Sequence, residues 1–556
     1  MKKILSAAIL ALIMIVAVAS AQHRPSDKLR MAEAVIAQYY VDTVNEPKLV
    51  EDAIRGMLRE LDPHSAYSTP EETRELNEPL QGNFSGIGIT FNINKDTLYV
   101  VQTVSGGPSE KVGMLAGDRI IAVNDTSIAG VKMKNSDVMK RLRGPKGTKV
   151  NVKVLRKSAA STDTIDFRIT RDDIPIYSVD AAYMVDENTG YVRLNKFAAE
   201  TPKEIREAIS KLQKMGMENL ILDLTDNGGG YLIAAVDLLS ELLPSGSLAV
   251  YTEGRSSPRY NHLTEPSSRA PLFGKGRVAV MVNQYSASAS EITTGALQDY
   301  DRGVIVGRRT FGKGLVQRPV PFPDGSMMRL TVAHYYTPTG RDIQKPYSKG
   351  KGEAYEKDIA DRLNQGELMH RDSIHFADSL KVNTLLHGRT IYGGGGITPD
   401  VFVPLDTARF TKYYRDVMAK GVLNQFVIKY VDTHRKELKK RYSRDDDFVK
   451  KFEVTDAMLR EIYDMATKEG VEFREEQAES SAPMMRAVVK GLIGRDIYDN
   501  QTYFKVYNGI DPIFQAALSI IKSPDYDKLL DGRLAPFETP VKSDKADSGP
   551  SSDKNQ

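Results

Sequence analysis

The chain has 556 residues, enough for roughly two to four domains, and its 76 Lys plus Arg nearly balance its 73 Asp plus Glu, giving a formal net charge of +3. A basic surface for nucleic acid is therefore not indicated, and no basic stretch is interleaved with aromatic residues. Cysteine is absent, which excludes disulfides, thiolate catalysis, a lipid-modified N-terminal cysteine and cysteine metal ligands.

The N-terminus has the pattern of a secretory signal peptide. Lys2 and Lys3 precede an apolar run over residues 4–18, and Ala19-Ser20-Ala21 follows with small residues at the spacing of a cleavage site. The run is shorter than the ~20 residues that span a bilayer, which favours cleavage over an uncleaved membrane anchor. We therefore expect residues 1–21 to be removed and the protein to be exported to the periplasm, the cell envelope or the extracellular space.

Two regions of different character follow. Residues 26–80 repeat apolar side chains at spacings of three and four, which predicts a helical N-terminal region. It ends in the turn-like Leu61-Asp62-Pro63-His64-Ser65, where His64 is a candidate base but its place beside a proline turn favours a structural role. Residues 84–172 hold short β-rich runs separated by Gly, Asn, Asp and Pro turns, which predicts a compact β domain.

Residues 173–345 alternate strand-like and helix-like segments, the pattern of an α/β core. The apolar run 220–224 leads into a glycine triplet, and the run 278–282 leads into serines at positions 286, 288 and 290. A third run, 304–306, precedes Lys313, which stands between two glycines. Because α/β folds place their sites at the carboxyl ends of strands, we expect these segments to form one site.

The rest of the chain divides into four parts. Residues 346–390 are charged and are predicted as an insertion, in which His370 and His375 are better interpreted as surface histidines than as metal ligands. Residues 391–405 return to the core, and residues 406–540 are predicted as a separate, highly charged helical C-terminal region. Residues 541–556 are expected to be a disordered tail.

Serine and lysine together form a coherent catalytic hypothesis. A serine hydroxyl is a poor nucleophile at neutral pH and needs a neighbouring base, and a lysine amine becomes that base only where burial lowers its pKa. Taken singly, small residues at a strand-to-helix turn are more often a cap, and a glycine triplet is more often a turn. Other hydrolase motifs are missing: there is no G-x-S-x-G or H-E-x-x-H, and Ser519-x-x-Lys522 lacks its partner motifs.

The serine segment 286–291, followed by Phe311-Gly312-Lys313-Gly314 and Gln317, resembles the carboxyl-terminal processing peptidases, also called tail-specific proteases. Further matches run in order over roughly residues 35–405, omitting the insertion. They are the segments 56–58, 61–65, 223–230, 336–341 and 396–400. One departure is visible, because Thr225 stands where the family usually has an arginine.

The resemblance implies a PDZ domain over residues 84–172 and a crotonase-like ββα peptidase core. The backbone N–H groups of Gly86-Ile87-Gly88-Ile89 would hold a peptide's terminal carboxylate. The implied catalytic residues are Ser288 as nucleophile, Lys313 as general base, Gln317 as the residue that holds the lysine, and the N–H groups of Ala289 and Gly229 as oxyanion donors.

We therefore expect a multidomain α/β protein that acts as an exported, ATP-independent serine endopeptidase on proteins recognised by their C-terminal tails. Its expected partners are protein or peptide substrates with free C-termini, and neither nucleic acid, a metal nor a cofactor is implied. A homo-oligomer and an adaptor protein stay open as further partners. The alternative function is a non-catalytic PDZ scaffold or an assembly factor on the same fold.

Overall fold

The computed structural model describes residues 24–94, 96–104, 106–157, 162–265 and 270–540. The expected signal peptide, residues 1–21, and the expected tail, residues 541–556, lie outside these ranges. The described chain forms two compact units, one made of residues 24–73, 317–331 and 347–355 and the other of the remainder. Within these ranges every helix is too short or too polar to cross a membrane.

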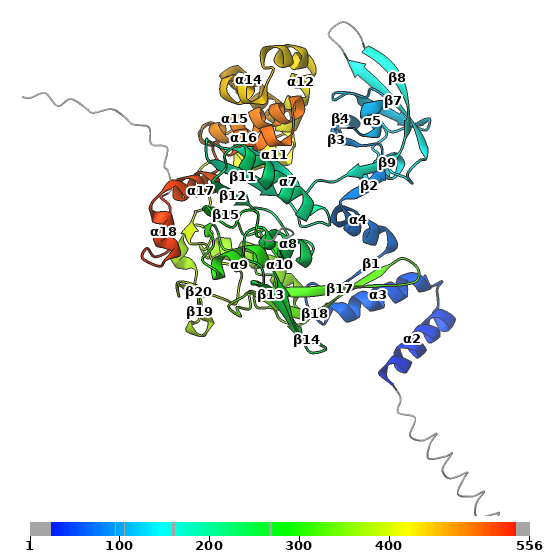
Figure 1. Ribbon diagram of the computed structural model, residues 1–556. Helices are drawn as coiled ribbons and strands as arrows, with labels where there is room; N and C mark the ends of the chain where they lie inside the picture. Colours follow the sequence, from blue (N-terminus) through cyan, green and yellow to red (C-terminus); the bar gives the residue numbers. More distant parts are fainter. Residues whose placement is uncertain (1–23, 95, 105, 158–161, 266–269, 541–556) are drawn as a thin grey trace, which may run out of the picture. The chain divides into compact units, whose positions relative to one another are not determined.

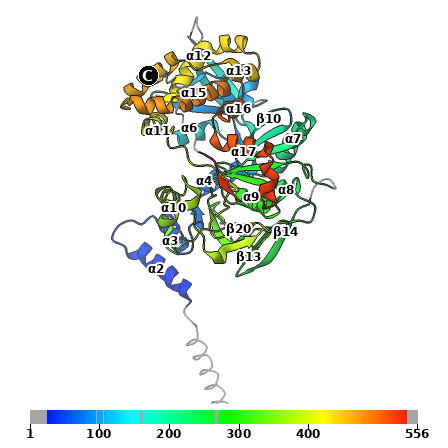
Figure 2. The same cartoon turned by 90° about the vertical axis from the view of Figure 1, so that its left-hand side faces the viewer.

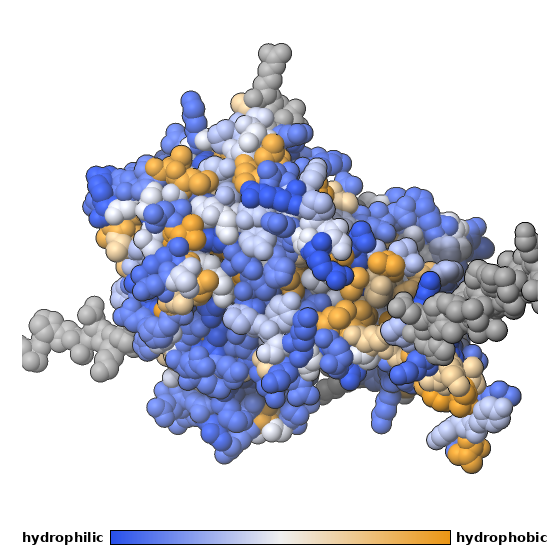
Figure 3. Space-filling model, turned by 90° about the horizontal axis from the view of Figure 1, so that it is seen from below, coloured by the Kyte–Doolittle hydropathy of each residue, from blue (hydrophilic) through white to orange (hydrophobic). Residues whose placement is uncertain are grey.

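The first unit contains α2 (Pro25–Tyr39), α3 (Glu46–Arg59) and β1 (Ala66–Ser68). The Asn45 side chain caps α3 by accepting a 3.2 Å hydrogen bond from the Lys48 N–H. β1 pairs antiparallel with the first residues of β18. α2 has no buried residue, and Figure 3 shows in orange where exposed hydrophobic residues interrupt the hydrophilic surface. Three elements belong partly to each unit: α4 (Pro70–Gln81), β17 (Leu315–Pro321) and β18 (Met327–Tyr336).

A β-rich domain begins the second unit (Figure 1). β2 (Asn83–Gly86) pairs antiparallel with β9 (Asp172–Pro175). A second sheet has the order β3-β4-β5-β7-β8, with β6 on β5. Its strands are β3 (Ile89–Asn94), β4 (Thr97–Thr103), β5 (Arg119–Val123), β6 (Thr126–Ser127), β7 (Lys149–Lys157) and β8 (Thr162–Thr170), accompanied by α5 (Pro108–Lys111) and α6 (Asn135–Leu142). Val150, Val152 and Val154 alternate along β7 into the domain's core, as a strand with one buried face requires.

The centre of the second unit is a seven-stranded sheet in the order β10-β11-β12-β15-β16-β21-β22. β10 and β11 are antiparallel, and the other neighbouring strands are parallel. The strands are β10 (Val179–Met184), β11 (Thr189–Leu194), β12 (Asn219–Asp223), β15 (Val278–Val282), β16 (Val304–Gly307), β21 (Val401–Phe402) and β22 (Phe537–Glu538). Every residue of β15 is buried, because helices cover both faces of the sheet.

One face of this sheet packs against α7 (Thr201–Lys214), α8 (Leu232–Ser240) and α9 (Ala289–Asp299). The other face packs against α17 (Pro512–Lys522) and α18 (Asp525–Leu530), shown in red in Figure 2. The region 406–540, expected to be separate, is therefore divided. Its last part belongs to the core, because apolar side chains such as Phe514 and Ile521 bury themselves against Met281 and its neighbours.

A further sheet is antiparallel, with β13 (Leu248–Gly254) between β14 (Ser257–Leu263) and the end of β18. The insertion forms α10 (Gly352–Asn364), η1 (Arg371–Ser373), η2 (Asp378–Leu380) and a hairpin of β19 (Lys381–Asn383) with β20 (Thr390–Tyr392). Buried ion pairs attach it to the core, since Arg309 pairs with Glu367 and Arg389 pairs with Asp301, each at 2.6 Å.

The remaining helices form a body with its own hydrophobic core. They are α11 (Lys412–Ala419), α12 (Val422–Arg441), α13 (Asp445–Lys451), α14 (Asp456–Lys468), α15 (Glu475–Ile497) and α16 (Asn500–Tyr507). Side-chain oxygens of Thr411, Thr455 and Asp499 cap the first turns of α11, α14 and α16. These caps explain why the charged sequence breaks into helices at those positions.

Candidate active site

The serines at positions 286, 288 and 290 have different environments. Ser286 and Ser290 are fully buried, and their hydroxyl groups donate 2.8 Å hydrogen bonds to the backbone carbonyls of Leu224 and Asn227. Ser288 is partly exposed and has a φ of +57°, a backbone conformation that costs a non-glycine residue about 1–3 kcal/mol. Strain of this kind is typical of a nucleophile that is held at a sharp strand-to-helix turn.

Gly229 lies directly against the turn that carries Ser288. A Cβ atom at Gly229 would stand 2.7 Å from Ala287 O, 2.8 Å from Ser288 Cβ and 2.9 Å from Ala289 N, so only glycine fits. Ala289 is the first residue of α9, and its N–H therefore has no acceptor within the helix. The Gly229 N–H donates to Asn227 Oδ1 at 2.9 Å, so an oxyanion would compete with Asn227 for this donor.

Glu291 connects the turn that carries Ser288 (residues 286–291, the serine turn) to the loop that carries Lys313 (residues 310–314, the lysine loop). Its Oε2 accepts hydrogen bonds from the N–H groups of Ser288 and Lys313, each at 2.8 Å. Its Oε1 accepts from the Gly312 N–H at 2.7 Å and from the Thr310 hydroxyl at 2.6 Å. Burial of the side chain raises the pKa of Glu291, and the four hydrogen bonds oppose that rise. The carboxylate therefore fixes the spacing between the backbones of residues 288 and 313.

The lysine loop is held from two further directions. The Tyr335 hydroxyl contacts the backbone carbonyl of Ser288 at 3.1 Å and that of Lys313. Arg362, from the insertion, is buried and donates to the Thr310 carbonyl at 3.1 Å. The insertion therefore helps to shape the loop that presents Lys313.

Arg193 donates hydrogen bonds to the start of the segment 223–230, which contains the glycine triplet and is called the glycine loop here. Its Nη1 donates to Asp223 Oδ2 at 2.6 Å and to Thr225 Oγ1 at 2.8 Å, and its Nη2 donates to Thr225 O at 3.2 Å. The guanidinium carbon lies 4.7 Å from the ring centre of Phe504 on α16. Thr225, which stands where the family usually has an arginine, therefore has the guanidinium of Arg193 on β11 beside it. That guanidinium binds both the side chain and the backbone carbonyl of Thr225.

A buried acid lies near this arginine. Asp511 precedes α17 and accepts a 3.0 Å hydrogen bond from the Ile513 N–H. Burial raises the pKa of Asp511 to about 6, and the negative charge of Asp223 adds to the rise, whereas the charges of Arg308 and Arg193 oppose it. The charge beside the glycine loop therefore changes at mildly acidic pH.

Gln317 is part of the first unit, on the extended strand β17. Its Nε2 donates a long 3.4 Å hydrogen bond to Thr331 Oγ1, which in turn donates to Asp62 Oδ1 at 2.9 Å. His64 Nε2 lies 2.9 Å from the Tyr355 hydroxyl, and the two rings meet edge to face. His64 thus has a packing partner, and the expected contact between Gln317 and the lysine stays a prediction.

The segment 86–89 forms the bend between β2 and β3. Its carbonyl oxygens are occupied, because Ile87 O accepts from the Ser109 N–H at 3.0 Å and Gly88 O accepts from the Val104 N–H at 3.0 Å. Gly88 has a φ of +73°, which turns the backbone. Among the described residues, the N–H groups of Ile87 and Gly88 have no hydrogen-bond acceptor. Two adjacent donors of this kind can bind a carboxylate.

Glu291 and Arg193 are two residues of this site that sequence reasoning missed. Glu291 follows Ser288 by three residues at a helix start, which is the spacing of a capping box. Arg193 is a charged residue inside an otherwise apolar strand, a second usable signal. In the described part of the chain, no group of three or more His, Asp or Glu side chains could hold a metal ion.

Comparisons with known families and proteins agree with this architecture. Peptidase family S41 matches residues 188–350, and the PDZ domain family matches residues 85–172. The activating protease CtpB N-terminal domain matches residues 16–73, and a family of unknown function, DUF8443, matches residues 413–499. The chain thus has the architecture of multidomain α/β proteins that join a PDZ domain to an S41 peptidase domain.

Individual relatives carry the assignment further. The chain is 35% identical over 309 residues to a carboxy-terminal-processing protease of Bartonella bacilliformis. The match covers 55% of this chain and 69% of that protein. It is also 33% identical over 335 residues to the carboxy-terminal processing protease CtpA of Bacillus subtilis. That match covers 60% of this chain and 70% of the CtpA protein. The chain belongs to the carboxy-terminal processing protease family.

Two further similarities are weaker in coverage or in structure. A probable CtpA-like serine protease of Staphylococcus epidermidis is 35% identical over 327 residues, and the match spans 58% of this chain and 63% of that protein. Among solved structures, the photosystem II D1 C-terminal processing protease is 33% identical and has a TM-score of 0.33, with 58% of this chain and 84% of that chain covered.

Proposed function

We propose that the chain is an exported, ATP-independent serine endopeptidase that cleaves proteins recognised by their C-terminal tails, with Ser288 as nucleophile and Lys313 as general base. The observation that carries this proposal is the contrast among the three serines. The hydroxyl groups of Ser286 and Ser290 donate hydrogen bonds to backbone carbonyls in the protein interior, whereas Ser288 is partly exposed on a strained turn. Family membership supports the same reading.

The proposed reaction is acyl transfer to serine. Uncharged Lys313 accepts the hydroxyl proton as Ser288 Oγ attacks the peptide carbonyl carbon, and the resulting ammonium group of Lys313 then returns that proton to the leaving nitrogen. The N–H groups of Ala289 and Gly229 stabilise the oxyanion, and each such donor is worth roughly 10²–10³ in rate. Water then hydrolyses the acyl-enzyme. Glu291 supports the step by tying the backbones of Ser288 and Lys313 to one carboxylate.

The same proposal assigns tail recognition to the PDZ domain. The N–H groups of Ile87 and Gly88 take the terminal carboxylate, and the peptide extends the sheet as an added strand. This assignment rests on the two donors that have no acceptor among the described residues. It predicts that amidation of a substrate's C-terminus raises KM while kcat changes little.

The decisive experiment is cleavage of a fluorescently labelled, unfolded protein without ATP. Ser288→Ala should abolish cleavage and leave binding of the substrate tail intact. Ser286→Ala is the matched control, because it removes a hydroxyl from the same turn without removing the proposed nucleophile. Cleavage by Ser288→Ala at the wild-type rate, or no cleavage by the wild-type protein, would refute the proposal.

Export is tested separately by expressing residues 1–556 and sequencing the N-terminus of the protein in each cell fraction. The proposal expects the exported protein to begin at Gln22. A chain that keeps Met1 and stays in the cytoplasm would contradict export and leave the catalytic proposal untouched.

A further inference from the structure

A second lysine, Lys345, is buried beside the lysine loop. Its side chain is only 4% exposed, although a lysine is almost never fully buried unless it is paired. The Lys345 N–H donates to the Gly312 carbonyl at 2.9 Å, and the ammonium nitrogen lies 3.9 Å from the ring centre of Phe311. Both the backbone and the side chain of Lys345 therefore contact the loop that presents Lys313.

The carboxylate that pairs with Lys345 comes from the insertion. Asp358 lies on the part of α10 that belongs to the same unit as the loop, and its Oδ2 is 3.0 Å from the ammonium nitrogen. Four residues later, Arg362 donates to the Arg309 carbonyl at 2.8 Å and to the Thr310 carbonyl at 3.1 Å. Residues four apart share one face of a helix, so a single face of α10 holds both the lysine and the start of the loop.

The ion pair does not compensate for the burial of the lysine. Burial lowers the pKa of Lys345, the hydrogen bond and charge of Asp358 oppose the decrease without cancelling it, and the charges of Arg362 and Arg309 add to it. Hydrophobic residues of similar volume often replace a buried ion pair without loss of stability. The charged pair is therefore better explained by the geometry that it selects than by the stability that it adds.

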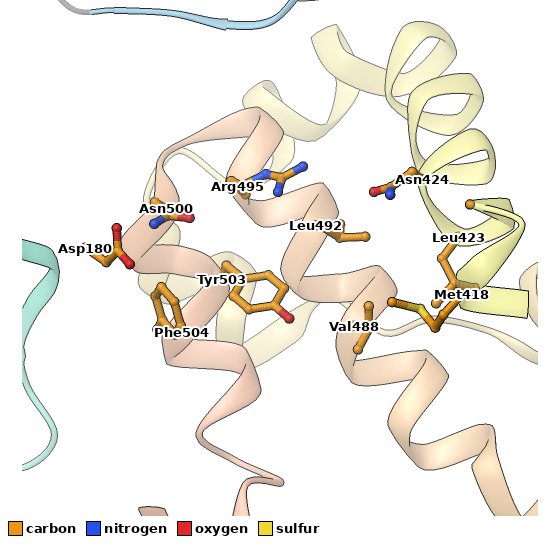
Figure 4. A pocket seen from close by; sticks show the side chains of 11 residues that line it. Asp180, Met418, Leu423, Asn424, Val488, Leu492, Arg495, Asn500, Tyr503 and Phe504 are labelled. Atoms are coloured by element: carbon orange, nitrogen blue, oxygen red, sulfur yellow. The ribbon is translucent and has the colours of Figure 1, made fainter. Parts of the chain in front are cut away.

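A cavity elsewhere in the second unit shows a different arrangement of charge. It has a volume of about 360 Å³ and lies among α11, α12, α15 and α16, and Figure 4 shows Arg495 and Asp180 among its side chains. Arg495 Nε lies 3.3 Å from Asp496 on the same helix, and Asp180 accepts a 2.7 Å hydrogen bond from Asn195. These charges are satisfied locally, whereas the charge of Lys345 joins the insertion to the lysine loop.

The residues around Lys345 also link the lysine loop to the serine turn. The Phe311 N–H donates to the Ser286 carbonyl at 3.0 Å. On the other side of the proposed base, the Gly314 N–H donates to Oε1 of Gln344, the residue before Lys345, at 2.8 Å. Residues 344 and 345 therefore restrain the loop on both sides of that base.

We propose that Lys345 is a positioning residue for the peptidase reaction, and that the insertion sets the geometry of the lysine loop through the Lys345–Asp358 pair. Asp358 draws the ammonium group over Phe311, and the lysine then holds the loop in the arrangement that presents Lys313 to the nucleophile. The ammonium group of Lys345 transfers no proton in this role. The role rests on the proposed function, because Lys313 is the base that it positions.

The experiment measures kcat and KM of the full chain for a fluorescently labelled, unfolded protein. Lys345→Met keeps an apolar stem and removes the charge, and Asp358→Asn removes the charge of the partner. Each variant should lower kcat about tenfold or more and leave KM within twofold, because a displacement of ~1 Å costs roughly 10² in rate. The matched controls are Lys357→Met and Asp361→Asn, the same changes at exposed positions of α10, which should keep wild-type values.

A double variant tests whether the two residues act as one pair. Lys345→Met combined with Asp358→Asn should lower kcat no further than Lys345→Met alone, since the effects of residues that interact are not additive. Losses that multiply would show that the two residues act independently and would overturn the proposal. A kcat within twofold of the wild type for either single variant, or a loss confined to KM, would overturn it as well.

Hydrogen exchange followed by mass spectrometry gives a readout that needs no cleavage. In Lys345→Met, the amides of residues 310–314 should exchange faster, while the amides of β15 keep their wild-type rates. Faster exchange throughout β15 would assign Lys345 a general structural role and contradict the proposal. No cleavage by the wild-type protein would refute the peptidase activity, whereas wild-type exchange of the loop in Lys345→Met would refute the positioning role alone. The two failures are therefore distinguishable.

Discussion

Replacing Glu291 by glutamine tests the link between the serine turn and the lysine loop. The carboxylate accepts four hydrogen bonds, two on each oxygen. Glutamine keeps one oxygen, so two hydrogen bonds lose their acceptor, and its NH₂ group then faces a backbone N–H. Hydrogen bonds to charged groups contribute about 1.5–3 kcal/mol each, so the expected loss of local stability is about 3–6 kcal/mol.

The consequence for catalysis follows from geometry. Without the shared carboxylate, the backbones of Ser288 and Lys313 can move apart, and a displacement of ~1 Å costs roughly 10² in rate. We therefore expect Glu291→Gln to lower kcat at least a hundredfold with little change in KM for a labelled unfolded protein. Hydrogen exchange followed by mass spectrometry should show faster exchange of the amides in residues 308–316.

The matched control is Glu207→Gln, the same change at an exposed position of α7. It should leave both kcat and amide exchange at wild-type values. If Glu291→Gln keeps kcat within twofold of the wild type and the loop exchanges no faster, the carboxylate does not set the geometry of the site.

Substitutions at three other residues, Gly229, Arg193 and Asp511, probe the same region, with related substitutions as controls. Gly229→Ala should reduce kcat by a factor of ~10² or more, because its Cβ would meet Ser288 Cβ at 2.8 Å, whereas Gly228→Ala should be nearly silent because a Cβ there has no atom within 4 Å; equal activity of the two would contradict this. Arg193→Met should lower kcat about tenfold or more by releasing Thr225, and Arg193→Lys should restore part of the loss; an unchanged kcat for Arg193→Met would count against that role. The pKa of Asp511 is raised from 3.8 to about 6, so its contribution to stability is present below pH ~4 and is lost as pH rises through ~6, a change of about 3 kcal/mol. The Tm advantage of Asp511→Asn over the wild type should therefore grow between these pH values and then level off, and a constant difference from pH 4 to pH 7 would disprove the assignment.

The sequence predicts which loops meet at the site better than it predicts the contacts within the site. The apolar runs 220–224, 278–282 and 304–306 correspond to β12, β15 and β16, which are neighbouring parallel strands of the seven-stranded sheet. Parallel neighbours end at the same edge, so the loops after them meet there. The contact between Gly229 and the Ser288 turn follows from this rule.

The contacts that sequence reasoning missed join segments far apart in the chain. Arg362 comes from the insertion and reaches the carbonyl of Thr310, and no periodicity or spacing marks such a pair. The packing partner of α17 could not be predicted for a different reason. An amphipathic helix in a charged region has the same sequence pattern whether its apolar face covers a sheet or packs on another helix. Tertiary packing decides between these alternatives, and it adds α17 to the core.

The position of α17 and β22 in the chain has a consequence for biosynthesis. β22 spans Phe537–Glu538 and pairs with β21, more than a hundred residues earlier in the chain. While the ribosome is still making the polypeptide, the face of the sheet around Met281 therefore stays uncovered until α17 and α18, residues 512–530, emerge. A nascent chain that carries every residue of the catalytic loops should remain incomplete as a folded domain until residues 512–538, which form α17, α18 and β22, have also been made.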